Sequence, residues 1–444
     1  MPADARAFLR QCFEIGLGAV SGESAISSAI RRDGAAIRIG DFPPRFSVDP
    51  RRAHVLAAGK AALTMARAWH AHAGAPRAGL AIAREPGVLP APWRALVGGH
   101  PLPSEASAQA GRAALAFAAA VPADAELVVL LSGGASALLS TPLPGLSIAE
   151  VRETTDLLLR CGAEIGELNC VRKHLTGVGG GRLAAATAAR VVVGLVISDV
   201  IDDDLGTIGS GPCAPDATTF ADAVAALRAR AIWERAPAAV RAHLERGVAG
   251  EVPETPKPGA RAFERVRHHI AANNLAARTA IARSVADDGT VAVLADGPPL
   301  RGEARVVGAE IVRDCLRERR AGALAGRRTL WIRGGETTVT VRGEGRGGRC
   351  QELALAAAIA LEGEGGVTLL AAGTDGSDGP TAAAGAFADR ESCVRGRAAG
   401  VDARDALARN DAHGFFEREG GLFETGATGT NALDLVLVLV EPRS

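Results

Sequence analysis

Five uninterrupted apolar runs constrain the fold of this chain more than any other feature of the sequence. They lie at 54–59, 126–134, 191–199, 291–297 and 367–376, and each ends in Gly, Ser or Asp. Most of them are followed by an alanine-rich stretch that is typical of a helix. Strands buried on both faces do not alternate polar and apolar residues, so the order of strand, small-residue turn and helix predicts βαβ units and a parallel sheet. The predicted fold class is therefore α/β, and we expect ligands to bind beyond the carboxyl ends of the strands.

The length of the chain predicts more than one domain. With 444 residues it is too long for one ordinary domain. The segment 247–260 is rich in Pro, Gly and charged residues, which is typical of a linker or surface loop. We therefore predict a first domain over 1–250 and a second over 260–444. In the second, residues 337–343 (TTVTVRG) alternate strictly and predict a strand with one exposed face.

Composition argues against several classes of partner. The chain has 50 Lys and Arg against 50 Asp and Glu, so its formal net charge is zero, which disfavours a general nucleic-acid or acidic-membrane surface. Only 3% of the residues are aromatic, which disfavours base stacking. No apolar run reaches the roughly 20 residues that span a bilayer, and the N-terminus lacks the apolar core of a signal peptide. The seven scattered cysteines include no CxxC pair and fit free thiols. We expect a cytoplasmic protein that binds neither nucleic acid nor membrane.

Two segments of the first half are candidates for anion binding. Lys60 follows the first apolar run at the start of a predicted helix, where it would add positive charge to the helix N-terminus. It is not a Walker A lysine, because the required flanking Gly and Ser or Thr are missing. Ser132, Gly133 and Gly134 follow the second run and would expose consecutive N–H groups to phosphate or carboxylate. A simple tight turn is the alternative interpretation of this second segment.

Basic and acidic side chains follow further along the first half. Arg172 begins a run of three basic residues, 172–174, which cannot share one helix face. One of them could border an anion pocket, and a solvated helix end is the alternative. Asp199 ends the third apolar run, and Asp203 lies within the acidic run 202–204. Carboxylates at a strand end suit Mg²⁺ or the deprotonation of a hydroxyl, whereas a solvated loop is the alternative.

A glycine-rich segment of the second half allows three interpretations. Gly343, Gly345 and Gly348 match the G-x-G-x-x-G pattern of a dinucleotide site. The preceding segment alternates, however, whereas a first Rossmann strand is buried on both faces. Arg346 and Arg349 beside the turn favour a charge-assisted clamp on carboxylate or phosphate. A dinucleotide site and a structural turn remain as alternatives.

The remaining candidates also lie in the second half. Asp375 and Asp378 follow the last apolar run and predict a second metal or base site, although the EF-hand spacing is absent and a plain Asp-Gly turn is the alternative. Asn274 and Glu336 are further candidates for polar contacts with a substrate.

Taken in order, the motifs of the whole chain resemble one known family. The motifs are AAGKAA, GHPLPSEAS, LSGGASALL, VRKHLTG, ISDVIDDDL, ADGPPLRGEAR, GGETTVTVRGEGRGGR and GTDGSDGPTAAAGA. Together they resemble the class II glycerate kinases, the glycerate 2-kinase family with a C-terminal MOFRL domain. Some members of that family carry an older label of hydroxypyruvate reductase. The resemblance runs from about residue 6 to residue 440.

The resemblance implies a fold and an activity. It implies ATP-dependent phosphorylation of D-glycerate, usually at the 2-hydroxyl, with Mg²⁺. It also implies an active-site cleft between an N-terminal Rossmann-like three-layer α/β/α domain and a C-terminal α/β MOFRL domain, about 330–440. Lys60 and Arg349 match basic positions of that cleft, and its acidic positions are matched by Asp199, Asp203, Asp375 and Asp378. The sequence departs from the family at Asp202, Gly179, Cys350 and Ala382, where Gly, Lys, Asn and Asp are usual.

We combine the motifs and the resemblance into one hypothesis about the site. The catalytic residues would be Lys60, Asp199 and Arg349. The contacts to substrate or phosphate would come from Ser132, Gly133, Gly134, Arg172, Asn274, Glu336 and Asp375. The metal ligands would be Asp203 and Asp378.

The expected small-molecule partners are ATP and glycerate. The sequence does not determine the oligomeric state, and a homodimer is one candidate. The rival enzyme is an NAD(P)H-dependent hydroxypyruvate reductase, based on the single G-x-G-x-x-G and on the older label. A third hypothesis is a ligand-binding protein that has kept the fold of the family but is not an enzyme. The absence of the usual Lys at Gly179 and of the usual Asp at Ala382 supports this hypothesis.

Overall fold

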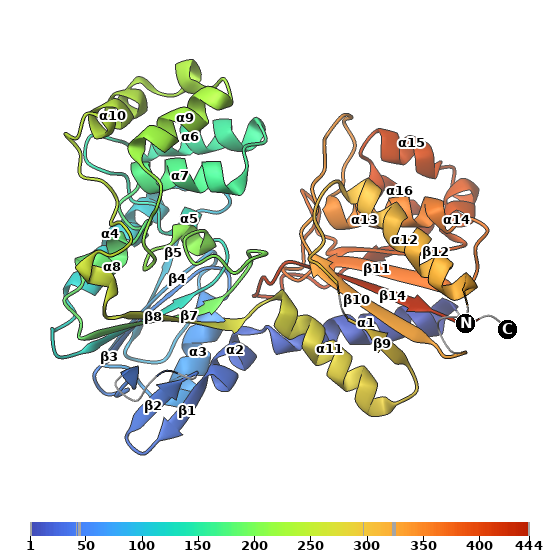
Figure 1. The fold of residues 1–444 in the computed structure, drawn as a ribbon, viewed down its shortest axis with the longest axis horizontal. Coiled ribbons are helices and arrows are strands. Elements are labelled where there is room, and N and C mark those ends of the chain that lie inside the picture. The colour runs from blue at the N-terminus through green and yellow to red at the C-terminus, as the bar shows by residue number, and fades with distance from the viewer. Residues whose placement is uncertain (1, 41, 43–45, 296, 322–325, 443–444) are drawn as a thin grey trace. The chain divides into compact units, whose positions relative to one another are not determined.

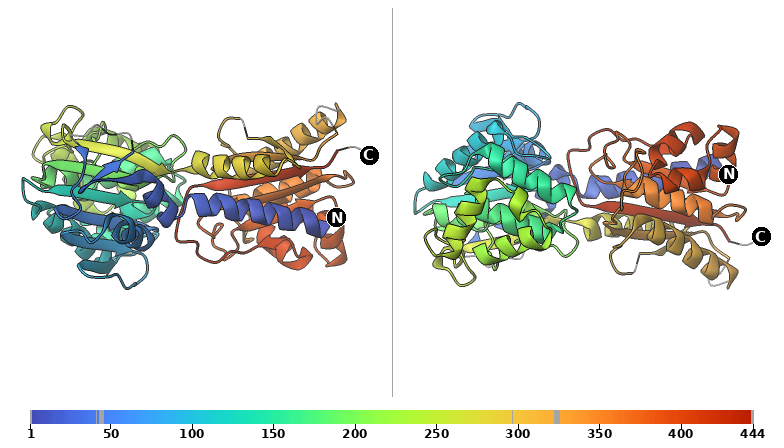
Figure 2. Two further views of the ribbon diagram at one scale, coloured as in Figure 1. Left: turned by 90° about the horizontal axis from the view of Figure 1, so that it is seen from below. Right: turned by 90° about the horizontal axis from the view of Figure 1, so that it is seen from above.

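A computed structural model describes residues 2–40, 42, 46–295, 297–321 and 326–442, and these form two compact units. One unit is Gly22–Ala271, and the other combines Met1–Ser21 with Ala272–Ser444. This division differs from the expected one, because the N-terminal helix α1 (Pro2–Ala19) packs with the C-terminal part of the chain. Figures 1 and 2 show α1 beside helix α11 (Asn274–Asp288), and Gly16 leaves room for the Ile281 side chain.

The unit Gly22–Ala271 is built on a Rossmann-like sheet. Its strand order is β5-β4-β3-β6-β7-β8. The strands are β3 (Ala53–Ala58), β4 (Ala78–Ala83), β5 (Trp93–Val97), β6 (Glu126–Leu131), β7 (Val191–Ile197) and β8 (Val266–Ala272). The chain runs from β3 outward to β4 and β5, then returns to the other side of β3 with β6 and β7, and these pairings are all parallel. The order of the strands therefore reverses between β3 and β6, which is where such sheets bind ligands.

Helices cover both faces of this sheet, as its apolar central strands β6 and β7 predict. Every residue of β6 and β7 is buried. Helices α2 (Gly22–Ala29) and α3 (Ala62–Ala73) lie on one face, while α4 (Glu105–Ala119), α5 (Ala135–Leu138) and α8 (Arg182–Ala186) pack on the other. A separate apolar cluster holds together α6 (Ile148–Arg160), α7 (Ile165–Leu175), α9 (Phe220–Ala229) and α10 (Ala238–Val248). A short hairpin, β1 (Ile30–Asp33) and β2 (Ala36–Ile39), completes the unit in Figure 1.

The second unit is also a three-layer α/β/α structure, but its sheet is mixed. The strand order is β13-β12-β11-β14-β10-β9. The strands are β9 (Ala292–Leu294), β10 (Thr329–Gly335), β11 (Val367–Gly373), β12 (Gly385–Asp389), β13 (Leu422–Phe423) and β14 (Asp434–Val440). Strand β14 lies between β10 and β11 and is antiparallel to both, whereas β9 and β10 are parallel. The prediction of a parallel strand at 367–376 is therefore wrong in direction, although β11 is buried as expected.

Helices explain why β11 and β14 are buried on both faces. Helices α1 and α11 lie on one face of the mixed sheet (Figure 2), and α12 (Ala304–Arg320) and α13 (Arg349–Ala360) pack on the other. The smaller helices α14 (Ser392–Ala398), α15 (Ala403–Ala408) and α16 (Ala412–Glu419) pack around α13. Within the described part of the chain, no helix is both long and apolar enough to cross a membrane.

Two expectations about the second unit are wrong in detail. Residues 337–343 do not form a strand, because only Thr338 makes a single bridge, to Glu303. The predicted alternation holds only in part: Thr337 is buried and Val339 packs against the core, but Val341 is 73% exposed. The apolar run 291–297 supplies only the short β9 at the sheet edge, where its residues stay partly exposed.

Candidate functional site

The loops that follow β3 and β6 are locked together at the point where the strand order reverses. The N–H of Lys60 donates to the carbonyl oxygen of Gly133 (2.9 Å), and the N–H of Ala61 donates to the hydroxyl oxygen of Ser132 (3.0 Å). Gly59 has φ 122°, and a Cβ there would collide with Ser132. The glycine therefore allows the two loops to approach closely enough to hold Lys60 and Ser132 in one place.

The second of these loops presents backbone donors beside two basic side chains. Gly134 has φ 84°, and a Cβ on it would lie 3.4 Å from Lys60 Cγ and 3.1 Å from His100 Nε2. Among the residues that the structure describes, no protein group accepts a hydrogen bond from the N–H of Gly133 or Gly134. Donors of this kind next to a lysine are suited to an anion such as phosphate or carboxylate. The structure thus brings Lys60 and the 132–134 segment together, as predicted.

His100 is not among the predicted site residues, although its position in the sequence carries a signal. His100 lies in the loop after β5, within the motif GHPLPSEAS. Strand β5 belongs to the same parallel sheet, so its carboxyl end opens on the same edge as those of β3 and β6. The signal for His100 is therefore its place after a parallel strand of this sheet.

Asp199 and Asp203 follow the neighbouring strand, β7. Both are partly buried, and Asp203 has a left-handed backbone with φ 53°. Across the described residues, no group of three or more His, Cys, Asp or Glu side chains is placed to hold a metal ion. Mg²⁺ needs only one or two protein carboxylates when phosphate oxygens and water complete its shell, so the metal role of Asp203 stays a prediction.

The three basic residues at the end of α7 have different surroundings. Lys173 is buried against Asp216 (3.4 Å), and His174 is fully buried with its Nε2 3.2 Å from Glu254. These two side chains stabilise the fold and do not form a solvated helix end. Arg172 is different, because burial lowers the pKa of its guanidinium to about 10 and no carboxylate counters that effect. Its side chain lines a small pocket.

In the second unit, Arg349 is held by two carboxylates. It is the first residue of α13, and its Nε and Nη2 bind Asp434 at 2.6 and 3.0 Å, while its Nη1 lies 2.8 Å from Glu336. Asp434 begins β14 and pairs with Gly335 on one side and Gly373 on the other. Burial lowers the pKa of Arg349, but the charge of Asp434 outweighs it and holds that pKa above its ordinary value. The positive charge is therefore balanced within the protein.

Asp375 and Asn274 lie around the same buried carboxylate. One oxygen of Asp375 and one of Asp434 each lie 3.4 Å from the point where a Cβ on Gly373 would be. The Asn274 amide donates to the backbone carbonyl groups of Ala432 (3.0 Å) and Asp434 (2.9 Å). Four predicted residues are thus gathered around Asp434: Arg349, Glu336, Asp375 and Asn274. The sequence analysis missed Asp434, whose signal is a carboxylate at the start of an apolar run.

The glycine-rich loop 343–348 is filled by the protein itself. The N–H of Gly343 donates to the Asn410 side chain (3.1 Å), and the N–H of Arg346 donates to the Asp411 side chain (3.1 Å). A dinucleotide site needs these backbone groups free for the pyrophosphate. The structure therefore favours the structural-turn interpretation of this loop over the dinucleotide site.

Asp378 also serves the protein's own backbone. Its two carboxylate oxygens accept from the N–H groups of Cys350 (3.1 Å) and Gln351 (2.8 Å) at the start of α13. The side chain is buried, which raises its pKa to about 6. Gly348 is required beside it, because a Cβ there would collide with this carboxylate. Asp378 therefore caps α13, and its role as a metal ligand stays a prediction.

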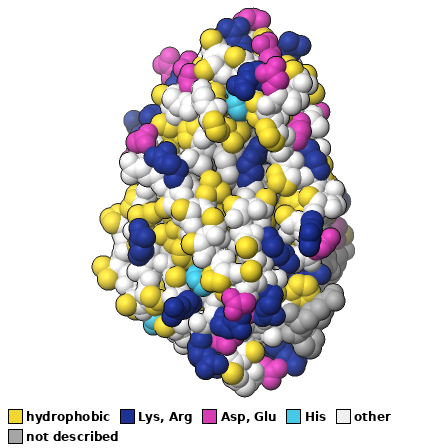
Figure 3. All heavy atoms as spheres, turned by 90° about the vertical axis from the view of Figure 1, so that its left-hand side faces the viewer, with side chains coloured by type: hydrophobic (Ala, Val, Ile, Leu, Met, Phe, Trp, Pro, Cys, Tyr) yellow, Lys and Arg dark blue, Asp and Glu magenta, His cyan; other side chains and the backbone are white. Residues whose placement is uncertain are grey.

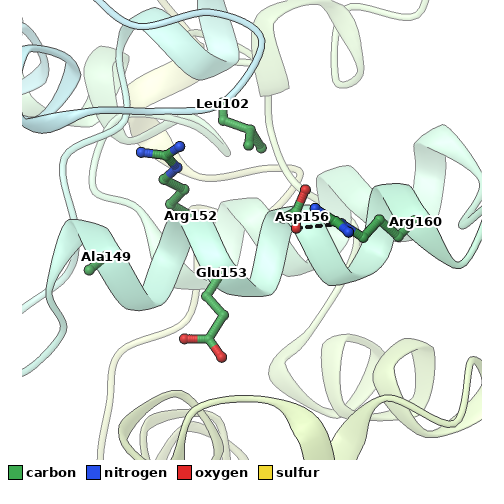
Figure 4. Close-up of a pocket in the computed structure, with 6 residues that line it drawn as sticks. All are labelled: Leu102, Ala149, Arg152, Glu153, Asp156 and Arg160. Carbon is green, nitrogen blue, oxygen red and sulfur yellow. Dashed lines mark hydrogen bonds and ion pairs between the residues drawn. The ribbon is translucent and has the colours of Figure 1, made fainter.

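A shallow pocket on α6 does not add to these sites. Figure 4 shows Arg152 directed toward Leu102, Glu153 directed away from it, and Arg160 paired with Asp156 at 2.7 Å. This is an ordinary exposed helix face with one i,i+4 ion pair. On the face of the molecule seen in Figure 3, basic, acidic and hydrophobic side chains are also intermixed, and no basic patch stands out.

Comparison with known proteins gives one consistent result. The family model described as a domain of unknown function, DUF4147, matches residues 8–245, and the MOFRL family model matches residues 329–434. A protein of Pyrococcus horikoshii named glycerate 2-kinase is 38% identical over 78% of this chain and 77% of its own length. A protein of Thermotoga maritima named D-glycerate 2-kinase is 37% identical over 89% of this chain and 92% of its own length.

One solved structure and one differently named relative complete the comparison. The crystal structure of a glycerate kinase from Thermotoga maritima matches with a TM-score of 0.81 and 33% identity, covering 99% of this chain and 100% of that one. A relative from Agrobacterium vitis that carries a hydroxypyruvate reductase name is 36% identical over 98% of this chain and 94% of its own length.

Proposed function

The chain belongs to the glycerate kinase family that joins a DUF4147 domain to a MOFRL domain, and we propose that it transfers a phosphoryl group from ATP to the 2-hydroxyl of D-glycerate. The observation that carries this proposal is the meeting of Lys60 with the N–H groups of Gly133 and Gly134 where the strand order of the Rossmann-like sheet reverses. Phosphoryl transfer is catalysed by positioning and by neutralisation of phosphate charge. These groups are suited to both tasks.

Each group at the strand ends has a proposed task. The Lys60 ammonium neutralises charge on the phosphate oxygens, and the N–H groups of Gly133 and Gly134 donate to those oxygens. Asp199 follows the adjacent strand β7 and accepts the proton of the attacking hydroxyl. His100, which lies beside Gly134, is a further donor to a bound anion.

The proposed metal is Mg²⁺ held by Asp203, and the residues present fit it. Two carboxylates, Asp199 and Asp203, follow one strand of the sheet that carries the anion site. Mg²⁺ is bound in proteins by one or two carboxylates together with phosphate oxygens. When bound, it reduces the negative charge that the attacking hydroxyl must approach.

In the second unit, Arg349 holds together the group of side chains around Asp434. We keep Glu336, Asp375 and Asn274 as proposed contacts to the substrate or phosphate. The free thiols of the seven cysteines suit a reducing environment, and we propose the cytoplasm as the compartment. A homodimer stays a prediction.

The reductase alternative is less well supported. It rests on the G-x-G-x-x-G pattern and on the name of some relatives. The N–H groups of Gly343 and Arg346 are bound by Asn410 and Asp411, so the loop lacks the bare donors that a pyrophosphate requires.

The purified protein, incubated with D-glycerate and Mg-ATP, should give 2-phosphoglycerate and ADP. A ³¹P NMR spectrum of the product reports both the transfer and its position. Consumption of NADH with hydroxypyruvate, in the absence of any phosphorylated product, would favour the reductase. The same mixture without Mg²⁺ is the control for the metal.

Replacement of Asp378 by Ala should lower the free energy of unfolding by about 1–2 kcal/mol, because α13 loses its side-chain cap. Urea unfolding followed by circular dichroism measures this. If Asp378 serves only as this cap, the Mg²⁺ concentration that gives half-maximal activity stays unchanged. The matched control is Asp402→Ala, which removes the exposed cap of α15. A large rise in the required Mg²⁺ with normal stability would instead make Asp378 a metal ligand.

A further inference from the structure

Arg172 is a half-buried cation without a counter-charge. Within the described residues, no ion pair or hydrogen bond engages its guanidinium, and burial is the cause that depresses its pKa. The neighbouring buried Lys173, in contrast, is paired with Asp216. Withdrawing part of a charge from water without giving it a partner costs stability. An anion bound beside Arg172 would offset that cost.

The pocket beside Arg172 is lined by hydroxyl groups. Ser140 is 3% exposed, and its hydroxyl has no partner among the described residues. Ser136 and Ser210 also line the pocket, and the Ser210 hydroxyl donates to the Ser136 hydroxyl at 2.8 Å. The wall at Gly179 carries no side chain. The free space is about 10 Å³, which is about what one water molecule or one carboxylate oxygen occupies.

The pocket is close to the proposed phosphate site. Ser136 lies on the single turn α5, whose N-cap is Gly134, and Gly134 in turn lies beside Lys60. A helix rises by about 1.5 Å per residue, so Ser136, two residues after Gly134, lies only about 3 Å further along the axis, which is within the reach of a three-carbon acid. In glycerate the 2-hydroxyl is one carbon away from the carboxylate. A single small molecule can therefore engage both sites.

We propose that Arg172 and Ser140 bind the carboxylate of glycerate and so restrict the enzyme to hydroxy acids. The identity of the ligand rests on the proposed function. One carboxylate oxygen enters the pocket, accepts from the Ser140 hydroxyl and balances the Arg172 charge. This orients the 2-hydroxyl toward the phosphate that Lys60 and Gly134 hold. Arg349, whose charge is already balanced, is not needed for that purpose.

The test compares Arg172→Gln and Ser140→Ala with the control Arg160→Gln, which removes an exposed arginine on α6. In Arg172→Gln we expect the KM for D-glycerate to rise about 100-fold, and in Ser140→Ala about 10-fold. The KM for ATP should stay within about threefold in both. The preference for D-glycerate over glyceramide should fall by at least about 30-fold in Arg172→Gln, a loss of discrimination that a structural defect would not produce.

Stability gives a second readout. Because the variant Arg172→Gln removes a half-buried charge that has no counter-charge, its melting temperature without ligand should equal or exceed that of the wild type. If this variant does not fold, Ser140→Ala carries the test, and an unchanged KM for glycerate there overturns the proposal. A rise in the KM for ATP alone also overturns it, since the pocket would then hold phosphate.

The proposal and the proposed function can fail separately. If the wild type does not phosphorylate glycerate, the function is wrong, and calorimetric titration with D-glycerate then tests the pocket directly. Binding by the wild type that is lost in Arg172→Gln supports the pocket. Equal binding by both proteins, or no binding by the wild type, refutes it.

Discussion

Replacement of Lys60 by Met should lower kcat/KM for the phosphorylation of glycerate by about 100- to 1000-fold, because a positioned donor to developing charge contributes this much. The side chain lies beside Gly134, and we propose that the N–H groups of Gly133 and Gly134 donate to the same anion as the ammonium. Removal of the ammonium leaves the backbone donors in place, so binding of ATP should weaken less than kcat falls. Steady-state kinetics with ATP and glycerate varied in turn separates the two effects.

The matched control for Lys60 is Arg67→Met on α3, the helix that directly follows Lys60. Arg67 is exposed on α3 and donates to the carbonyl oxygen of Val88, so its removal takes one positive charge from α3 without touching the strand ends. Its kinetics should equal those of the wild type. If Lys60→Met retains kcat/KM within about threefold of wild type, Lys60 does not stabilise the transferring phosphate.

The meeting of Lys60 with the 132–134 segment could be predicted because its signals are local. Each strand of the Gly22–Ala271 sheet that leads to it is an apolar run in sequence, and Lys60 and Gly134 follow their strands directly. The order of parallel strands then brings these loops together without further information. What local sequence cannot give is the choice among three adjacent basic residues. Only the packing of α7 shows that Lys173 and His174 turn into the core while Arg172 lines a pocket.

In the second unit the decisive contacts join distant residues. The direction of β11 depends on β14, which follows more than 60 positions later, and no pattern within β11 distinguishes an antiparallel from a parallel neighbour. The glycine-rich loop is similar in this respect. Its glycines make room for the backbone of residues 409–411, so a pattern that resembles a nucleotide site is satisfied by another part of the same unit. Asp434 was missed for the same reason.

Replacement of Arg349 by Met should destabilise the second unit by about 2–3 kcal/mol. Asp434 is 6% exposed, and it would be left as a buried carboxylate without its partner. Breaking a buried pair in this way costs about 3–5 kcal/mol, and we reduce the value because the Arg349 side chain is 34% exposed. Thermal unfolding should show a decrease of about 4–12 °C in melting temperature. Arg346→Met, which removes an exposed arginine 3.7 Å from Glu417, should change stability by less than about 0.5 kcal/mol.

The double variant Arg349→Met with Asp434→Asn separates stability from chemistry. Because it removes both charges, it should recover about half or more of the lost stability, as expected when a buried pair is replaced as a whole. If the double variant also recovers kcat, Arg349 acts by holding Asp434 in place. If it is stable but inactive, one of the two side chains contacts the substrate or the phosphate, and the balanced charge seen here is released in the catalytic complex. If Arg349→Met alone has wild-type stability, the buried Asp434 carboxylate does not need Arg349 as its partner.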